Sequence, residues 1–194
     1  LVTTARLESA RGKPGITFEQ VAARAGGLQA LTGPAAGPLA RLVGQGRQLE
    51  ARMLLDRWRD VFESRLAVEV QLHHVSGEEA ELAEALVELA GKAGVPWVPS
   101  NEPRYLDANG RRVHDFLTAL RAGVEYDTAL RRGLLLPNGE WRLKSPAEMA
   151  LLWKGREAGL EESLRIAHDC SFSLRWLRPP LPAFPTPAGQ SEAA

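Results

Sequence analysis

Hydrophobic residues recur at every third or fourth position in two long segments of this 194-residue sequence, which is the spacing of one face of an α-helix. Residues 47–63 carry one such stripe and residues 76–94 carry the other. The stripes consist of Ala51, Leu54, Leu55, Trp58, Val61 and Phe62 in the first segment and of Leu82, Leu86 and Leu89 in the second. We expect both segments to be helices that pack these faces against a core.

Polar side chains mark where helices begin. In a capping box, a Ser or Thr is followed three residues later by a Glu or Gln, and the two side chains satisfy backbone N–H groups at the helix start. The sequence contains three such pairs, Thr17 with Gln20, Ser76 with Glu79, and Ser145 with Glu148. Gly26-Gly27 and Gly94 are typical helix ends for the first two. We expect a helix to begin at each pair.

Three shorter apolar segments have the character of β-strands. Residues 66–73 alternate between two sides, as a strand does. One side carries Val68, Val70 and Leu72, and the other carries Glu69, Gln71 and His73. Residues 28–32 and 95–99 are also apolar, and the two prolines of 95–99 restrict that strand to the edge of a sheet. Helices and strands that alternate in this way predict an α/β fold with parallel strands.

Charge and cysteine content narrow the functional classes. The 24 basic and 24 acidic residues cancel, so no overall field attracts nucleic acid or an anionic membrane. Cys170 is the only cysteine, which excludes an internal disulfide and fits a reducing compartment. No apolar run approaches the roughly 18 residues that cross a bilayer. We therefore expect a cytoplasmic protein that does not associate with membranes.

The two ends of the sequence predict a piece of a longer protein. The first residue is Leu1 rather than Met, and no signal-peptide pattern follows it. Prolines are frequent in residues 179–194, where a semi-extended linker is expected.

Candidate chemistry is expected at the carboxyl ends of the strands, because the loops of parallel α/β folds converge there. The three predicted strands run into Thr32-Gly33-Pro34, His73-His74, and Ser100 to Arg104. Two other pairs are weaker candidates. His114 and Asp115 open an amphipathic stretch and are expected to be structural, and His168 and Cys170 lack further ligands nearby.

The succession of these segments resembles a known family. GGLQALTG, VEVQLHH, VPWVPSNEPRYLDANGRRVHDFLTALRAG, EWRLKSPAEM and LRIAHDCSFSL resemble the PHP domain (polymerase and histidinol phosphatase) of the bacterial C-family DNA polymerases, over residues 1–187. The resemblance implies that residues 1–178 are the carboxyl-terminal part of a distorted (β/α) barrel without its amino-terminal strands. Residues 179–194 then lead to a palm domain.

The resemblance also implies a place for metal ions, in the cleft where the barrel strands end. Metal-competent relatives have Ser-Gly-Cys where this sequence has Thr32-Gly33-Pro34. They have Asn-Asp-x-His where it has Asn101-Glu102-Pro103-Arg104. Neither proline nor a protonated arginine can bind a metal. Only His73 and Glu102 stand at matching positions with a possible ligand atom. We therefore expect no metal, no other cofactor and no catalytic residue.

Two main functions follow from the resemblance. The first is a non-catalytic scaffold that supports the palm and thumb of a polymerase, in its replicative or error-prone form, and docks other replication or repair subunits. DNA would then be bound only through the parent protein. The alternative is a residual metal-dependent phosphoesterase or 3′–5′ exonuclease, with zinc, manganese or magnesium held by His73, Glu102 and groups outside the sequence. A free-standing interaction module is a third, which the linker-like tail argues against.

Arg104 suggests one further hypothesis. It places a permanent positive charge where relatives have a ligand, beside Glu102 and, if the strand side chain points inward, near Glu69. Such a charge can replace a lost metal by pairing with carboxylates. The alternative is an arginine that is solvated on a surface loop.

Overall fold

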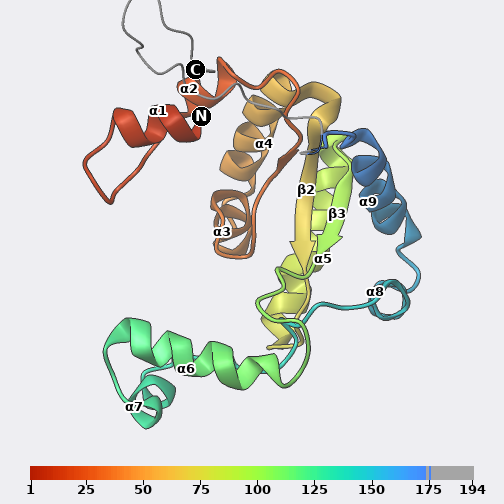
Figure 1. Cartoon of the computed structure of the whole chain (residues 1–194). Helices are drawn as coiled ribbons and strands as arrows, with labels where there is room; N and C mark the ends of the chain where they lie inside the picture. Colours follow the sequence, from red (N-terminus) through yellow and green to blue (C-terminus); the bar gives the residue numbers. More distant parts are fainter. Residues whose placement is uncertain (174, 176–194) are drawn as a thin grey trace, which may run out of the picture.

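A computed structural model describes residues 1–173 and 175, so the predicted linker at 179–194 lies outside the described residues (Figure 1). The elements are, in order, α1 (Val2–Leu7), α2 (Phe18–Ala22), β1 (Ala30–Leu31), α3 (Pro38–Gly44), α4 (Gln48–Phe62), η1 (Glu63–Arg65), β2 (Leu66–Gln71), α5 (Gly77–Ala93), β3 (Trp97–Ser100), α6 (Gly110–Ala122), α7 (Tyr126–Arg131), α8 (Pro146–Leu152) and α9 (Glu157–Asp169). In this part of the chain no helix is long and apolar enough to cross a membrane.

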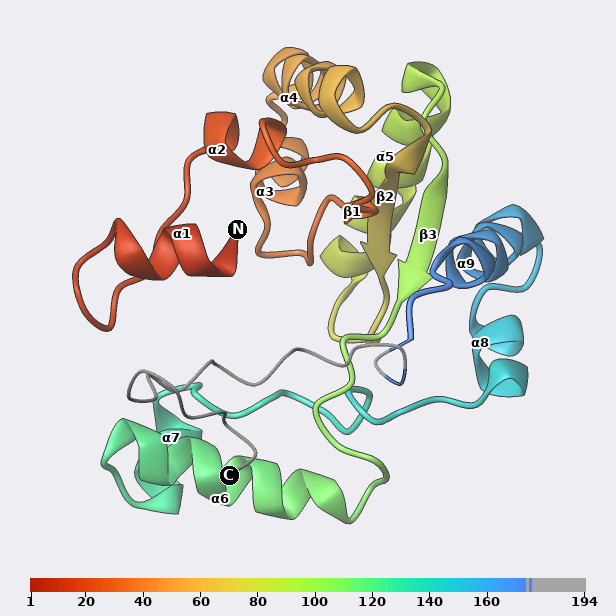
Figure 2. The ribbon, with the colours of Figure 1, turned by 45° about the horizontal axis from the view of Figure 1, so that its top comes forward.

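The strands form a parallel sheet in the order β1-β2-β3 (Figure 2). The predicted mixture of helices with parallel strands is therefore confirmed, whereas the assignment to part of a distorted (β/α) barrel stays a prediction. β3 lies at an edge among the described strands and contains Pro99, as its prolines predicted. The strand predicted at 28–32 is shorter, but Thr32 continues the pairing, since its N–H donates to the Ala67 carbonyl at 3.2 Å.

β2 is buried on both sides, which the alternating pattern did not indicate. Val68 and Val70 face the core as predicted. Gln71, and His73 just beyond the strand, are buried as well, although they belong to the side with polar residues. The covered polar side needs hydrogen-bond partners, and those partners build the candidate site described below.

Two predicted long helices form the main layer over the sheet. α4 and α5 occupy almost the full predicted ranges. α3 packs against both of them. The core contains Leu39, Leu55, Leu66, Val68, Leu86 and Leu89, which come from all three helices and β2. α9 packs against the edge strand β3. Gly159 of α9 lies directly against the indole of Trp97 in β3.

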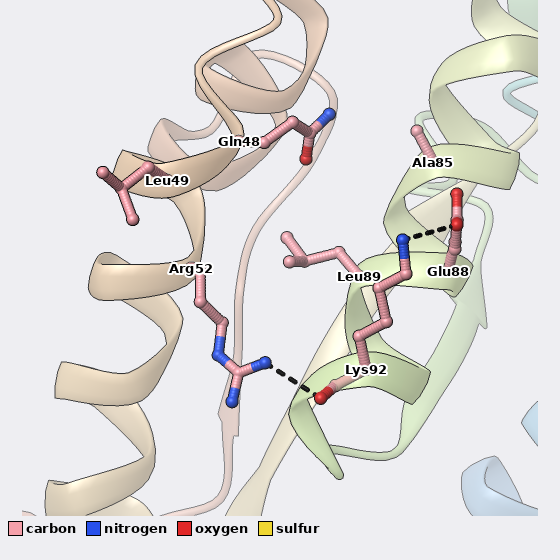
Figure 3. Close-up of a pocket in the computed structure, with 7 residues that line it drawn as sticks. All are labelled: Gln48, Leu49, Arg52, Ala85, Glu88, Leu89 and Lys92. Atoms are coloured by element: carbon pink, nitrogen blue, oxygen red, sulfur yellow. Dashed lines mark hydrogen bonds and ion pairs between the residues drawn. The ribbon is translucent and has the colours of Figure 1, made fainter.

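Two arginines of α4 donate hydrogen bonds to the last backbone carbonyls of α5. The last carbonyls of a helix have no partner within it, and cations near them are favourable. Arg52 Nη1 donates to the Lys92 carbonyl at 2.9 Å, and Arg59 Nη1 donates to the Ala93 carbonyl at 2.8 Å. A shallow groove of about 510 Å³ runs between the two helices (Figure 3). These contacts fix the angle between α4 and α5.

The predicted helix starts are largely confirmed. Thr17 and Ser145 form complete capping boxes with Gln20 and Glu148. Ser76 accepts the backbone N–H of Glu79 at 3.3 Å, but the Glu79 carboxylate does not return the bond. That carboxylate is instead used in the candidate site. α5 ends at Gly94 as predicted, and Gly94 is left-handed, whereas α2 ends at Ala22, before the predicted Gly26-Gly27.

Candidate functional site

The four positions that the resemblance aligns with metal ligands of relatives meet in one cleft at the carboxyl ends of the strands. Its volume is about 600 Å³, and we call it the strand-end cleft. Pro34, His73, Glu102 and Arg104 line it, together with Trp141 from the segment before α8. The expectation that these strand ends converge is confirmed.

His73 is held on both of its ring nitrogens. Its side chain is 3% exposed, with Nδ1 at 3.2 Å from Glu79 Oε1 and Nε2 at 3.1 Å from the Asn101 carbonyl oxygen. The same Glu79 oxygen accepts the His73 backbone N–H at 2.8 Å, and its second oxygen accepts the Val75 N–H at 2.9 Å. Glu79 therefore holds the turn between β2 and α5 closed around His73.

An aromatic ring covers the remaining face of His73. The indole of Trp141 stacks on the imidazole with ring centroids 4.0 Å apart and planes 5° apart. Asn138, from the same segment, donates from Nδ2 to the His73 carbonyl at 2.7 Å. Asn138 and Trp141 thus reach His73 from at least 65 residues away in the chain, whereas Glu79 and Asn101 are closer in sequence.

Glu102 and Arg104 pair with each other at the rim of the cleft. Arg104 Nη2 donates to Glu102 Oε1, and the two side chains are 49% and 33% exposed. Glu69 does not take part, because its Oε1 accepts from Gln71 Nε2 at 3.0 Å and from the Ser100 hydroxyl. The predicted pairing of Arg104 with Glu102 is therefore present, but water screens it.

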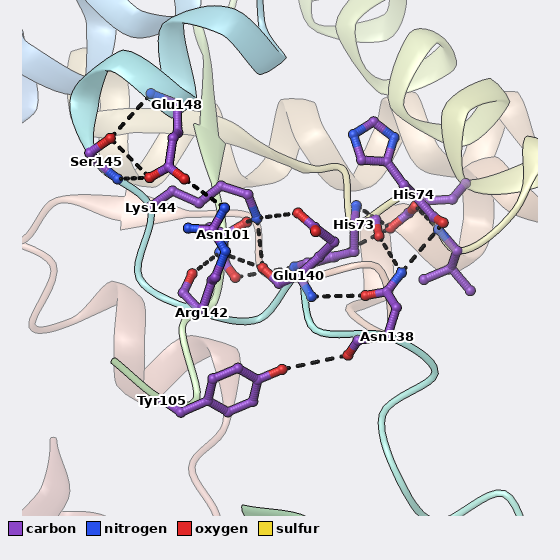
Figure 4. Close-up of polar contacts among 12 residues, drawn as sticks. His73, His74, Asn101, Tyr105, Asn138, Glu140, Arg142, Lys144, Ser145 and Glu148 are labelled. Atoms are coloured by element: carbon purple, nitrogen blue, oxygen red, sulfur yellow. Dashed lines mark hydrogen bonds and ion pairs between the residues drawn. The ribbon is translucent and has the colours of Figure 1, made fainter. Parts of the chain in front are cut away.

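A buried lysine organises the floor beside the cleft (Figure 4). The Lys144 side chain is only 4% exposed, and its ammonium has three donors. These donors reach Asn101 Oδ1 at 2.7 Å, the Glu140 carbonyl at 2.6 Å and Glu140 Oε2 at 2.9 Å. The lysine therefore has no donor left for a ligand.

The side-chain nitrogen of Asn101 also binds the segment that contains Glu140 and Arg142. Its Nδ2 donates to the Glu140 carbonyl at 2.9 Å and to the Arg142 carbonyl at 2.6 Å. Backbone bonds run alongside, from Arg104 N–H to the Trp141 carbonyl at 2.8 Å and from Leu143 N–H to the Tyr105 carbonyl at 2.9 Å. Residues 101–105 and 138–144 are thereby tied together. These two segments overlap two of the motifs that carried the family resemblance. The sequence did not indicate that the two motifs contact each other.

The carboxylates of this region are held in their charged form. The hydrogen bond from Lys144 lowers the pKa of Glu140 below its ordinary value. The pKa of Glu148 falls to about 2, first because Arg142 donates to it and then because the Ser145 backbone and hydroxyl do. A carboxylate with a lowered pKa is a weak base, so neither group is suited to accept a proton from a substrate at neutral pH.

The two weaker candidate pairs lie apart from the cleft. Asp115 is buried in α6, with Oδ2 at 3.5 Å from Arg111 Nε and Oδ1 at 3.6 Å from His114 Nδ1, which agrees with a structural role. His168 and Cys170 are exposed at the end of α9. Within residues 1–173 and 175, no three His, Cys, Asp or Glu side chains gather closely enough to hold a metal ion. That the protein binds no metal stays a prediction.

The sequence of this chain is similar to part of several bacterial DNA polymerases. The chain is 32% identical over 163 residues to the DNA polymerase III subunit alpha of Pseudomonas aeruginosa, covering 84% of this chain and 14% of that protein. It is 38% identical over 165 residues to the error-prone DNA polymerase of Anaeromyxobacter dehalogenans, covering 84% and 13%. It is 31% identical over 184 residues to the error-prone DNA polymerase of Mycobacterium tuberculosis, covering 94% and 16%.

The similarity thus extends over most of this chain but over a small part of each relative. The chain spans between 13% and 16% of the length of these three proteins. No protein-family model matches it.

Proposed function

This chain is homologous to one segment of the bacterial C-family DNA polymerases, and we propose that it is the carboxyl-terminal part of a PHP domain in such a polymerase. In this proposal residues 1–178 belong to the barrel and residues 179–194 lead towards the palm. The segment performs no chemistry. It supports the palm and thumb and offers a surface to other replication or repair subunits, while the parent polymerase acts on DNA in replication or translesion synthesis.

The observation that carries the proposal is that protein groups contact both ring nitrogens of His73 in the strand-end cleft and the ammonium of Lys144 beside it. His73 has an oxygen of the protein beside each ring nitrogen, and Lys144 uses all three donors within the fold. Buried hydrogen-bond networks of this kind stabilise one arrangement of a fold. A catalytic group, in contrast, needs a free atom that can reach a substrate. The cleft therefore supports a structural role.

The same contacts do not fit a metal centre. A ring nitrogen of His73 would have to leave Glu79 or the Asn101 carbonyl before it could bind zinc, manganese or magnesium. Glu102 is paired with Arg104, whose permanent charge repels a cation at that place. These observations argue against the alternative of a residual phosphoesterase or 3′–5′ exonuclease, and we derive no reaction step through a metal.

Calorimetric titration separates the two functions. We expect titration of zinc, manganese or magnesium into the parent polymerase to show no site tighter than about micromolar that depends on His73. A tight site that disappears in His73→Asn would establish the alternative function.

The scaffolding role has its own test. We expect Lys144→Met to lower the temperature at which the parent polymerase loses primer extension, because the cleft floor is weakened. Lys92→Met changes the same residue type at an exposed i,i+4 pair with Glu88 and serves as the control. Equal inactivation temperatures for both variants and the wild type would show that the segment does not support the polymerase.

A further inference from the structure

α6 turns its apolar side away from the protein. Val113, Phe116, Leu117 and Leu120 are 60%, 62%, 53% and 64% exposed. With 3.6 residues per turn they lie on one side of the helix. We call these four residues the outward face of α6. An amphipathic helix usually buries its apolar side, so the exposure of this side is unusual.

The opposite side of α6 fixes this orientation. Asp115 and Ala119 are buried there. Arg111 reaches across from the same side, and its Nη2 donates to the Leu136 carbonyl at 3.1 Å. α7 packs along α6, and both lie beyond the carboxyl ends of the strands, away from α3, α4 and α5 (Figures 1 and 2). The helix is therefore held with its outward face towards solvent.

Positive charge frames the outward face. The helical spacing puts Arg112 on one side of the stripe and Arg121 on the other. Both are exposed, and neither forms an ion pair within the part of the chain that the structure describes. The chain as a whole carries no net charge, so the positive charge of Arg112 and Arg121 beside the outward face is a local feature. An apolar centre with a charged rim is the composition of a protein interface.

We propose that the outward face of α6 docks against another part of the same polymerase chain, on a surface with an apolar centre and an acidic rim. This proposal rests on the proposed function. DNA does not fit, because its phosphates are bound by cations and would leave Phe116 and Leu117 uncovered. An acidic rim on the partner complements Arg112 and Arg121.

The size of the relatives favours a partner within the same chain. Matched segments account for only 13% to 16% of their length, so most of the polymerase surface lies outside the segment. Surfaces joined by a linker meet at an effective concentration of roughly millimolar, which makes even a modest apolar patch sufficient for docking. Other helices expose smaller sets of large apolar side chains, such as Leu49 with Met53 on α4 and Leu164 on α9.

Hydrogen–deuterium exchange of the parent polymerase tests the docking. We expect Phe116→Ser combined with Leu120→Ser to speed the exchange of the α6 amides at least about tenfold, which corresponds to about 1.4 kcal/mol. The control combines Leu49→Ser with Leu164→Ser, which alters two equally exposed leucines and leaves α6 unchanged.

Charge reversal provides the second variant. We expect Arg112→Glu with Arg121→Glu to speed α6 exchange as well, whereas Arg11→Glu with Arg41→Glu, at exposed positions elsewhere, has no effect on α6. Exchange of α6 that is the same in every variant overturns the docking. Protection that depends on protein concentration overturns the choice of partner, because it assigns the face to a second copy or a separate subunit.

The proposed function fails in a different way. If it fails, the Lys144→Met polymerase keeps its thermal stability. If only the docking fails, that variant is still destabilised and α6 exchange is insensitive to its outward face.

Discussion

Lys144→Met should weaken the fold far more than the same change at Lys92. Each lysine follows a glutamate by four residues and pairs with it, Lys144 with Glu140 and Lys92 with Glu88. The exposed fractions of the two lysine side chains are 4% and 69%. The two variants therefore share residue type, spacing and substitution, and differ in burial and in the contact of Lys144 with Asn101.

The size of the loss follows from the contacts. Without Lys144, Oδ1 of the buried Asn101 loses the only donor found for it among the described residues, and an unsatisfied buried acceptor costs about 1–3 kcal/mol. The Glu140 carbonyl keeps its bond from Asn101 Nδ2. The Glu140 carboxylate is 32% exposed and can be hydrated, so its ion pair contributes about 0–1 kcal/mol. We expect a total loss of about 2 kcal/mol.

Urea unfolding at neutral pH measures the difference. The midpoint should shift for Lys144→Met with an unchanged slope, since the surface exposed on unfolding is the same. Lys92→Met should unfold like the wild type. If both variants unfold at the same urea concentration, the buried network around Asn101 does not stabilise the fold and our account of the cleft is wrong.

Three further predictions address the rim, the packing and the pH dependence. Arg104→Ala should cost less than about 1 kcal/mol in urea unfolding, because its side chain is 49% exposed; a loss of about 3 kcal/mol would show a buried pair. Gly159→Ala should destabilise by about 1–3 kcal/mol, since its new Cβ would lie 2.5 Å from Trp97, whereas Gly91→Ala, with open space, should stabilise slightly. The folded-state pKa of Glu148 is lowered, so its stabilising effect should be complete above about pH 4.5 and disappear as the pH falls through about 2; a carboxyl NMR titration near 4.5 would contradict this.

Local signals in the sequence account for most of the predicted elements. The stripes of α4 and α5 and the capping boxes at Thr17 and Ser145 each depend on residues within one or two helical turns, so they can be read without knowing the fold. The outward orientation of α6 could not be read in that way. It depends on Arg111 reaching Leu136, which lies 25 residues away.

The candidate site shows the same division more sharply. The order of strands and loops predicted that His73 and Glu102 would reach one cleft, and this is confirmed. What encloses His73 could not be predicted, because Trp141 and Asn138 come from a segment without regular structure that is placed by Asn101 and Lys144. The alternating pattern of residues 66–73 placed His73 on the polar side of the strand but did not indicate its hydrogen-bond partners. A buried polar side must be satisfied, and here protein groups at long sequence separation satisfy it. Whether a histidine at the end of a strand is free to bind a ligand therefore depends on neighbours that are distant in the sequence.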